Sequence, residues 1–165
     1  MADRAEIRFP ELLPEVAPVL TMRGKYGLKA MLHLARLHED DRALSAEIAT
    51  ANAISKKFLD TILQDLRMAG LVLARKGRGG GYRLARSADC IKVGEVVRIL
   101  DGPVAPIHCA SRTAYQPCRD CPDEAACAVR LTMIDLRDAI AQVLDTRSLA
   151  DMAALADPVE ERRAS

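Results

Sequence analysis

The sequence lacks an apolar run long enough to cross a membrane, and it lacks a recognisable secretion signal. Crossing a bilayer takes about 20 consecutive apolar residues, and no stretch of the 165-residue chain approaches that length. Residues 1–20 carry four acidic and two basic groups and are interrupted by Pro10, Pro14 and Pro18, whereas a signal peptide has a basic start and an unbroken apolar centre. These absences exclude membrane-spanning proteins and predict a cytoplasmic protein with no membrane partner.

The chain also has almost no net charge, although its charges are unevenly distributed. Twenty-four Lys and Arg against 23 Asp and Glu leave a formal charge of +1. Residues 21–100 contain fifteen basic and eight acidic side chains, and residues 101–165 contain seven and eleven. Residues 66–88 have no acidic side chain, and their basic residues are Arg67, Arg75, Lys76, Arg78, Arg83 and Arg86. Such a concentration of positive charge favours phosphate binding, and the alternative is a solvated surface hairpin.

Apolar residues at helical spacing mark two short helices within residues 45–69. The first pattern begins at Ser45 and the second at Ser55, where a serine hydroxyl can accept hydrogen bonds from free backbone amides. A turn at residues 52–54 separates them. Gly70 follows the second pattern, as expected of a residue that ends a helix in the left-handed conformation. Two helices around a short turn predict a helix-turn-helix, whose second helix enters the DNA major groove.

A hairpin follows the second helix. Residues 71–74 and 82–84 read as strands, and residues 77–81 form a glycine-rich tip. A nucleotide-binding glycine loop fits less well, because Tyr82 stands where a third glycine is required and a strand follows where a helix is needed. The whole stretch therefore predicts a winged helix-turn-helix, flanked by helices over residues 22–38 and 93–100.

Five short motifs occur in order along the chain. They are Tyr26-Gly27-Leu28-Lys29-Ala30, Ile54-Ser55-Lys56-Lys57-Phe58-Leu59, Gly79-Gly80-Gly81-Tyr82-Arg83-Leu84-Ala85, Gly94-Glu95-Val96-Val97 and Asp101-Gly102-Pro103. Together they resemble the Rrf-type family of bacterial transcription regulators, which contains the IscR, NsrR, RirA and CymR repressors. The resemblance covers about residues 21–155. It implies a repressor rather than an enzyme, acting as a homodimer on double-stranded DNA with a pseudo-palindromic operator.

The predicted DNA contacts come from the second helix and the wing. The helix should present side chains to base edges and phosphates, and the wing should hold the backbone or the minor groove. Arg78 stands where members of the resembled family often have proline, which makes this wing tip more basic. The candidate residues are Ser55, Lys56, Lys57, Thr61, Gln64, Lys76, Arg78 and Arg83.

Four of the five cysteines are concentrated in one proline-interrupted stretch. Cys109, Cys118, Cys121 and Cys127 are separated by eight, two and five residues. Disulfides are disfavoured in the cytoplasm, and thiolates in an irregular loop suit a soft metal centre, either iron–sulfur or zinc. His108 is a further candidate ligand, and reduced thiols without a metal remain an alternative. The isolated Cys90 is interpreted as structural.

The resemblance implies an iron–sulfur cluster, with two or four irons, because three cysteines of this loop ligate one in cluster-carrying relatives. This chain has four, at a different spacing, and Lys25 stands where some relatives place a carboxylate ligand. A lysine ammonium has no lone pair to donate. The predicted function is a regulator that senses iron, redox or nitric oxide state. Alternatives are the same regulator with structural zinc or a thiol switch, and a dithiol oxidoreductase using Cys118-x2-Cys121, which lacks the required thioredoxin-like context.

Residues 125–144 predict a long helix with an apolar seam. Its members recur at spacings of four, three, four and three, as in a coiled coil, and are Val129, Met133, Leu136, Ile140 and Val143. The seam predicts pairing with the same helix of a second subunit, and residues 149–155 are expected to pack back on the dimer.

The predicted fold class is mainly α with a small β-hairpin, a winged helix-turn-helix domain plus a long C-terminal dimerisation helix. The predicted divisions are an N-terminal extension (1–20), the DNA-binding domain (21–103), the cysteine-rich loop (104–126), the dimerisation helix region (125–155) and a polar tail (156–165).

Overall fold

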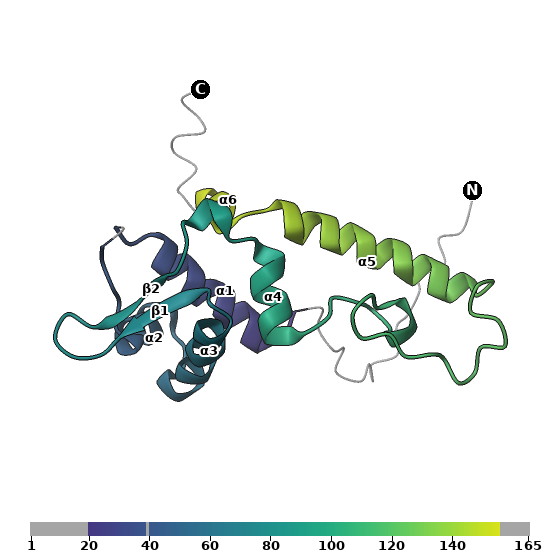
Figure 1. Ribbon diagram of the computed structural model, residues 1–165, viewed down its shortest axis with the longest axis horizontal. Helices are drawn as coiled ribbons and strands as arrows, with labels where there is room; N and C mark the ends of the chain where they lie inside the picture. Colours follow the sequence, from purple (N-terminus) through teal and green to yellow (C-terminus); the bar gives the residue numbers. More distant parts are fainter. Residues whose placement is uncertain (1–19, 39, 156–165) are drawn as a thin grey trace, which may run out of the picture.

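The computed structural model describes residues 20–38 and 40–155, so the predicted tail and nearly all of the N-terminal extension lie outside the described residues. The described chain is mainly helical with one two-stranded antiparallel sheet, which confirms the predicted fold class (Figure 1). Its elements are α1 (Met22–Ala35), α2 (Ser45–Asn52), α3 (Lys56–Met68), β1 (Val72–Arg75), β2 (Gly81–Leu84), η1 (Ala88–Cys90), α4 (Val93–Asp101), η2 (His108–Ala110), α5 (Ala128–Thr146) and α6 (Leu149–Ala154). None of the helices in these residues has the length and apolar character needed to cross a membrane.

Helix α1 is capped by Thr21, whose hydroxyl oxygen accepts hydrogen bonds from the backbone amides of Arg23 and Gly24. The same residue ties α1 to the end of α4. Its amide donates to Asp101 Oδ2 over 2.9 Å and its hydroxyl donates to Asp101 Oδ1. The helix ends at Ala35, three residues before the predicted end. The amides of Arg36 and Leu37 there bond to carbonyls three residues back, which tightens the last turn.

Two glycines let α1 and α4 approach closely. A Cβ atom at Gly27 would lie 2.0 Å from Leu100 Cδ1, and one at Gly24 would lie 2.3 Å from Asp101 Oδ2. Leu100 is buried in the core, so it has little room to move aside. The core itself contains fully buried side chains from several elements, among them Met31, Ile48, Leu59, Ile62, Leu63, Leu66, Ile91 and Val96.

The helix-turn-helix forms with one difference from the predicted capping. Leu44, not Ser45, occupies the N-cap position of α2, and its amide donates to the Glu47 carboxylate over 2.7 Å. A carboxylate at the third helical position can accept a hydrogen bond from the amide of the N-cap residue itself, which is a different amide from the one that a capping hydroxyl would satisfy. Ser55 does occupy the N-cap of α3, but its side chain makes no capping hydrogen bond. Ala53 adopts a left-handed conformation, φ 54°, at the turn between the helices.

Gly70 ends α3 as predicted. It has φ 76°, its amide bonds to the carbonyl of Arg67, and the amide of Leu71 bonds to the carbonyl of Leu66. This paired arrangement satisfies carbonyls that the helix end would otherwise leave free. The chain then enters β1 directly, and the side chains of Leu71 and Val72 are both buried in the core.

The wing is a hairpin of β1 and β2 in the register Val72↔Leu84 to Arg75↔Gly81. Ala43, in the connection between α1 and α2, forms an isolated antiparallel bridge with Tyr82 of β2. Ala43 and Tyr82 exchange backbone hydrogen bonds of 3.0 and 2.8 Å. The base of the wing is thereby joined to the residues that lead into α2.

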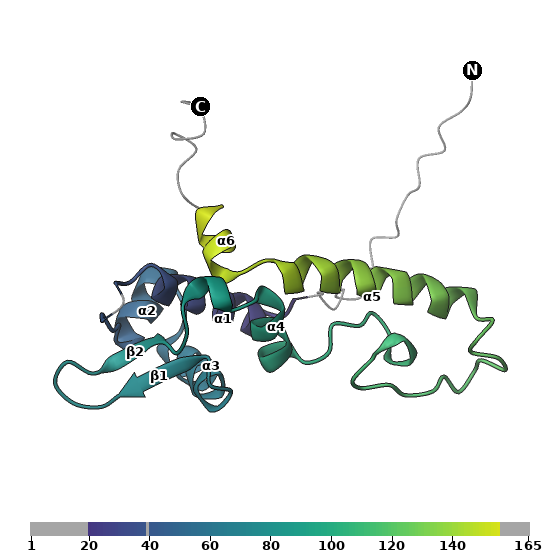
Figure 2. The same cartoon turned by 45° about the horizontal axis from the view of Figure 1, so that its top comes forward.

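Helix α5 projects away from this body, with the cysteine-containing segment running beside it (Figures 1 and 2). It begins at Ala128 instead of residue 125, because the Asp123 carboxylate accepts hydrogen bonds from the amides of Ala125 and Ala126 and holds them in a turn. None of the nineteen residues of α5 is buried.

The C-terminal end of α5 is joined to α4. Arg98 donates two hydrogen bonds to the Asp145 carboxylate, of 2.5 and 2.9 Å, and a Cβ atom at Gly94 would lie 2.1 Å from Asp145 Oδ1. This pairing lowers the pKa of Asp145 and raises that of Arg98. The chain then turns into α6, which packs on α1 and η1 of the same chain with Leu149 fully buried. Residues 149–154 thus pack on the body of their own chain, and the predicted packing on a dimer stays a prediction.

We expect Gly27→Val to lower the free energy of unfolding by roughly 1–3 kcal/mol, because the added side chain would overlap Leu100 and force α1 from α4. Urea denaturation followed by circular dichroism measures this change. Lys25→Val, at an exposed position of the same helix, is the control for the lower helix propensity of valine and should cost about 0.5 kcal/mol or less. Equal losses in the two variants would contradict the close-packing explanation.

Candidate functional site

The recognition helix α3 has one buried and one exposed face. Its buried residues are Leu59, Ile62, Leu63 and Leu66. The predicted DNA contacts Lys56, Lys57, Thr61 and Gln64 are all exposed, and so is Ser55 at the N-cap. The helix is therefore held by its apolar side and presents the predicted side chains to solvent.

The first turn of α3 contains two features that the sequence did not indicate. Lys56 donates to Asp60 over 2.7 Å, and hydrogen bonds from Lys56 and then Ser45 hold the pKa of Asp60 below its ordinary value. Phe58 is 36% exposed and meets Tyr26 edge to face, with ring centroids 5.9 Å apart. Asp60 thus offsets part of the positive charge at this end, and Phe58 braces α3 against α1.

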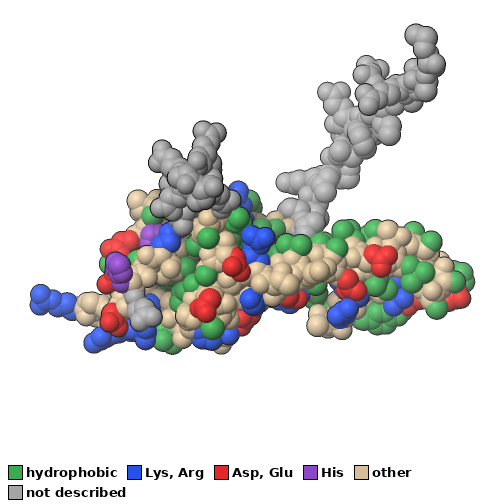
Figure 3. All heavy atoms as spheres, turned by 90° about the horizontal axis from the view of Figure 1, so that it is seen from above, with side chains coloured by type: hydrophobic (Ala, Val, Ile, Leu, Met, Phe, Trp, Pro, Cys, Tyr) green, Lys and Arg blue, Asp and Glu red, His purple; other side chains and the backbone are tan. Residues whose placement is uncertain are grey.

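The wing tip presents Lys76 and Arg78 to solvent, with Gly77 and Gly79 at positive φ. Figure 3 shows basic side chains gathered at the end of the molecule where the wing projects. Arg83 lies further back, in β2, and is half-buried. The structure therefore brings Lys76 and Arg78 together at the tip and separates Arg83 from them.

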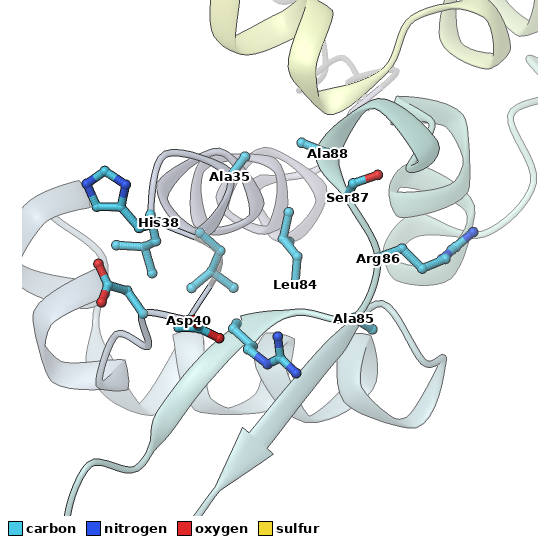
Figure 4. Close-up of a pocket in the computed structure, with 12 residues that line it drawn as sticks. Ala35, His38, Asp40, Leu84, Ala85, Arg86, Ser87 and Ala88 are labelled. Carbon is cyan, nitrogen blue, oxygen red and sulfur yellow. The ribbon is translucent and has the colours of Figure 1, made fainter.

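Arg83 lines a cavity of about 380 Å³ between the end of α1 and the segment after β2. Leu84 lies between His38 and Asp40 on one side and Ser87 and Ala88 on the other (Figure 4). Because Arg83 lies in this cavity wall and away from the tip, its side chain has limited reach toward a DNA backbone that contacts the tip.

The four loop cysteines come together in two pairs. Cys109 and Cys118 have their sulfur atoms 3.4 Å apart, and Cys121 and Cys127 have theirs 3.7 Å apart. Ligand atoms of Cys118 and Cys121 lie within 4.8 Å of one another and of an Asp120 carboxylate oxygen. The structure thus brings the four predicted ligands together as two pairs, and it places Asp120, which was not predicted, beside Cys118 and Cys121 in a group that does not include Cys109 or Cys127.

The other two ligand candidates are not part of this group. His108 opens η2 and is exposed, and the group of metal-ligating atoms found in the described residues contains Cys118, Asp120 and Cys121 without it. Lys25 is exposed on α1. Cys90 is exposed at the end of η1, outside the loop.

The spacing of the thiols fits a tetrahedral metal. Metal–sulfur bonds of about 2.3 Å place two sulfurs of one tetrahedron ~3.8 Å apart, close to both observed separations. Zinc and iron in an iron–sulfur cluster both accept this arrangement. The donor set therefore fits a thiolate-ligated metal and does not by itself distinguish the two.

The protein environment differs between the thiols. Cys127 is the N-cap of α5, and hydrogen bonds from the amide of Arg130, the thiol of Cys121 and the amide of Val129 lower its pKa. Cys109 is buried, and loss of solvent raises the pKa of its thiol. Glu124 connects the two sides of the loop, because it accepts a hydrogen bond from the Tyr115 hydroxyl and one of 2.7 Å from the Cys118 amide.

Comparison with known proteins shows which family the chain belongs to. The sequence profile of the Rrf2 family, described as iron-dependent transcriptional regulators, matches residues 20–155. The chain belongs to the Rrf2 family. An HTH-type transcriptional regulator described as rrf2-like, from Rhodobacter capsulatus, is 43% identical over 143 residues, which are 85% of this chain and 95% of that protein.

Solved structures support the same assignment. The structure of CymR, the global cysteine regulator of Bacillus subtilis, has a TM-score of 0.70 and 34% identity, over 84% of this chain and 98% of that one. IscR of T. potens has a TM-score of 0.67 and 29% identity, over 84% and 88%. The predicted family is confirmed. The Rrf2-family chain is thus a transcriptional regulator of a DNA-binding family and, like its relatives, not an enzyme.

Replacing Arg78 by Ala should weaken binding to all DNA sequences and reduce the slope of log affinity against log salt by about 0.9, the value of one phosphate contact. Gln64→Ala should instead change the preference among operator variants and leave the slope unaltered. Fluorescence anisotropy over a salt series measures both. Arg147→Ala, an exposed arginine after α5, is the control, and an Arg78 variant with the wild-type slope would show that the wing tip contacts no phosphate.

Proposed function

We propose that this Rrf2-family regulator is a homodimeric repressor that binds a pseudo-palindromic operator and senses iron, redox or nitric oxide state through an iron–sulfur cluster held by its own four loop cysteines. The observation that carries the proposal is the pairing of the four thiols at tetrahedral spacing. The site of action is the cytoplasm, where operator DNA is found.

A two-iron cluster agrees best with the pairing. Such clusters are held by four thiolates, two on each iron. Cys109 and Cys118 would bind one iron, and Cys121 and Cys127 the other. One chain then supplies every ligand, so the position occupied by Lys25 needs no carboxylate. When bound, the cluster would supply a centre that reacts with oxidants and nitric oxide.

Zinc is the second candidate, and it is favoured by Cys118, Cys121 and Asp120, whose ligand atoms lie within 4.8 Å of one another. A single zinc ion held by all four cysteines would need the four sulfurs about 3.8 Å from one another, so the two pairs would have to move closer together. The same DNA-binding role would then have a structural metal, and loss of the metal would leave the thiols open to oxidation.

Pairing of two subunits is supported by the exposed apolar side chains of α5. Val129, Leu131, Leu136 and Val143 are 45–65% exposed in the single chain, and such a row on a projecting helix is typical of an interface. Met133 and Ile140, the other members of the seam, are only partly buried. A second copy of α5 would cover this face and place two recognition helices on successive major grooves.

Metal analysis of protein purified without air tests the cluster. We expect brown protein with about two irons and two sulfides per chain, and loss of the colour on changing Cys109, Cys118, Cys121 or Cys127 to Ala. Cys90→Ala, outside the thiol group, should keep the colour. One zinc per chain without sulfide would replace the cluster by the zinc alternative.

Leu136→Asp should dissociate the dimer, since burying an unpaired carboxylate at the interface costs several kcal/mol. Operator affinity should fall with it, because two half-sites are no longer bridged. Sedimentation velocity measures the oligomeric state. Gln142→Asp, which adds the same charge at an exposed position off the seam, should remain dimeric. A dimeric Leu136 variant would place the interface elsewhere.

A further inference from the structure

Two arginines of α5 hold the short turn that contains Cys109. Arg130 Nε donates to the backbone carbonyl of Cys109 over 3.0 Å, and Arg137 Nη1 donates to the backbone carbonyl of Ala110 over 2.5 Å. The Arg137 side chain is only 12% exposed, so it reaches its acceptor largely shielded from water. Both contacts end on main-chain atoms, and neither depends on the state of the cysteine sulfur.

We call the contacts of Arg130 and Arg137 with this turn the clamp. Asp138 supports the clamp by holding Arg137. Its Oδ1 accepts from Arg137 Nε over 2.8 Å and from Arg112 Nη2 over 3.0 Å. Arg137 is thereby fixed from both sides, and the residue that follows the turn is also joined to α5. Cys109, Ala110 and Ser111 are all buried.

The segment that contains Cys118 and Cys121 has no comparable attachment. Within the described residues, the contact between the thiols of Cys121 and Cys127 is the only hydrogen bond or ion pair that joins residues 113–126 to α5 or its N-cap. The other contacts of this segment are internal, as between Tyr115 and Glu124, or they reach the turn, as from the Ala114 amide to Ser111 Oγ and from the Gln116 amide to the His108 carbonyl. Cys127, by contrast, is part of α5 as its N-cap.

The two thiol pairs are built in the same way. Cys109, held by the clamp, faces Cys118 at 3.4 Å, and Cys127, held by the helix, faces Cys121 at 3.7 Å. Each pair therefore contains one thiol held at α5 (Cys109 or Cys127) and one thiol of residues 113–126 (Cys118 or Cys121).

We infer that Arg130 and Arg137 are positioning residues for the cysteine site. They keep Cys109 beside the N-terminal end of α5 without any metal, so that Cys109 and Cys127 form a preorganised half-site. Metal binding then closes residues 113–126 onto this half-site through Cys118 and Cys121, and metal loss releases those residues alone. This inference rests on the proposed metal site, but its first consequence concerns the metal-free protein.

Hydrogen exchange of the reduced, metal-free full chain tests that consequence. The amides of Ala110 and Ser111, which bond to the carbonyls of Ile107 and His108, should be protected in the wild type, whereas residues 113–126 should exchange rapidly. Arg137→Met removes the donors while keeping an unbranched apolar stem, and the protection of Ala110 and Ser111 should be lost. Arg137→Lys should restore part of it, and Arg147→Met, a matched change at an exposed site after α5, should alter nothing.

Competition for Zn²⁺ with a chromophoric chelator gives the second readout, since thiolates bind zinc whichever metal is native. Loss of an outer-shell contact of this kind weakens metal binding by about 10–100-fold, and we expect that loss for Arg137→Met and not for Arg147→Met. Arg130→Met provides an independent variant should Arg137→Met fold poorly.

The outcomes separate this inference from the proposed function. Zinc in place of a cluster, or no bound metal at all, would refute the proposed cofactor while the exchange experiment still decides the clamp. Unchanged protection of Ala110 and Ser111 in the Arg137→Met and Arg130→Met variants would overturn the clamp. Strong protection of residues 113–126 in the metal-free wild type would overturn the preorganised half-site.

Discussion

The structure depends on one constraint: helix α5 cannot bury itself in a single chain. None of its residues is buried, and four large apolar side chains on it are exposed. The chain holds the helix through Arg98 and Asp145 near its C-terminal end, and through Arg130, Arg137 and Asp138, which bond to the segment around Cys109. The exposed apolar side chains lie on the same helix as these contacts, and in the proposed homodimer a second copy of α5 would cover them.

The winged-helix body, in contrast, is internally well determined. Gly24 and Gly27 allow α1 to approach α4, and Asp101 bonds back to Thr21 across that contact. Arg23 pairs with Asp65 and so joins α1 to α3. Because these contacts connect elements far apart in sequence, the recognition helix is positioned by the whole domain and not by its immediate neighbours.

Local patterns were sufficient to predict the helices and the wing, whereas the metal site inferred from the concentration of cysteines stays a prediction. Apolar spacing located α3 and α5, and Gly70 marked the end of α3, since glycine adopts a left-handed backbone without strain. Features that depend on three-dimensional proximity were not predictable in this way. The bridge between Ala43 and Tyr82, the pairing of Cys109 with Cys118 and the bonds from Arg137 to the Cys109 turn join residues whose separation in sequence gives no sign of contact. The N-cap at Leu44 was missed because leucine has no capping side chain, and the contact that marks this helix start is the bond from the Leu44 amide to Glu47.

The bridge between Ala43 and Tyr82 has a consequence for how the regulator can change its affinity for DNA. Backbone hydrogen bonds link the wing to the residues that enter α2, and α2 leads through one turn to the recognition helix. Within each chain, the wing and the recognition helix therefore keep a fixed arrangement. In the proposed homodimer, a signal that reached the DNA-binding part through α5 would change the distance and angle between the two recognition helices. It would leave the contacts of each subunit with its own half-site unaltered.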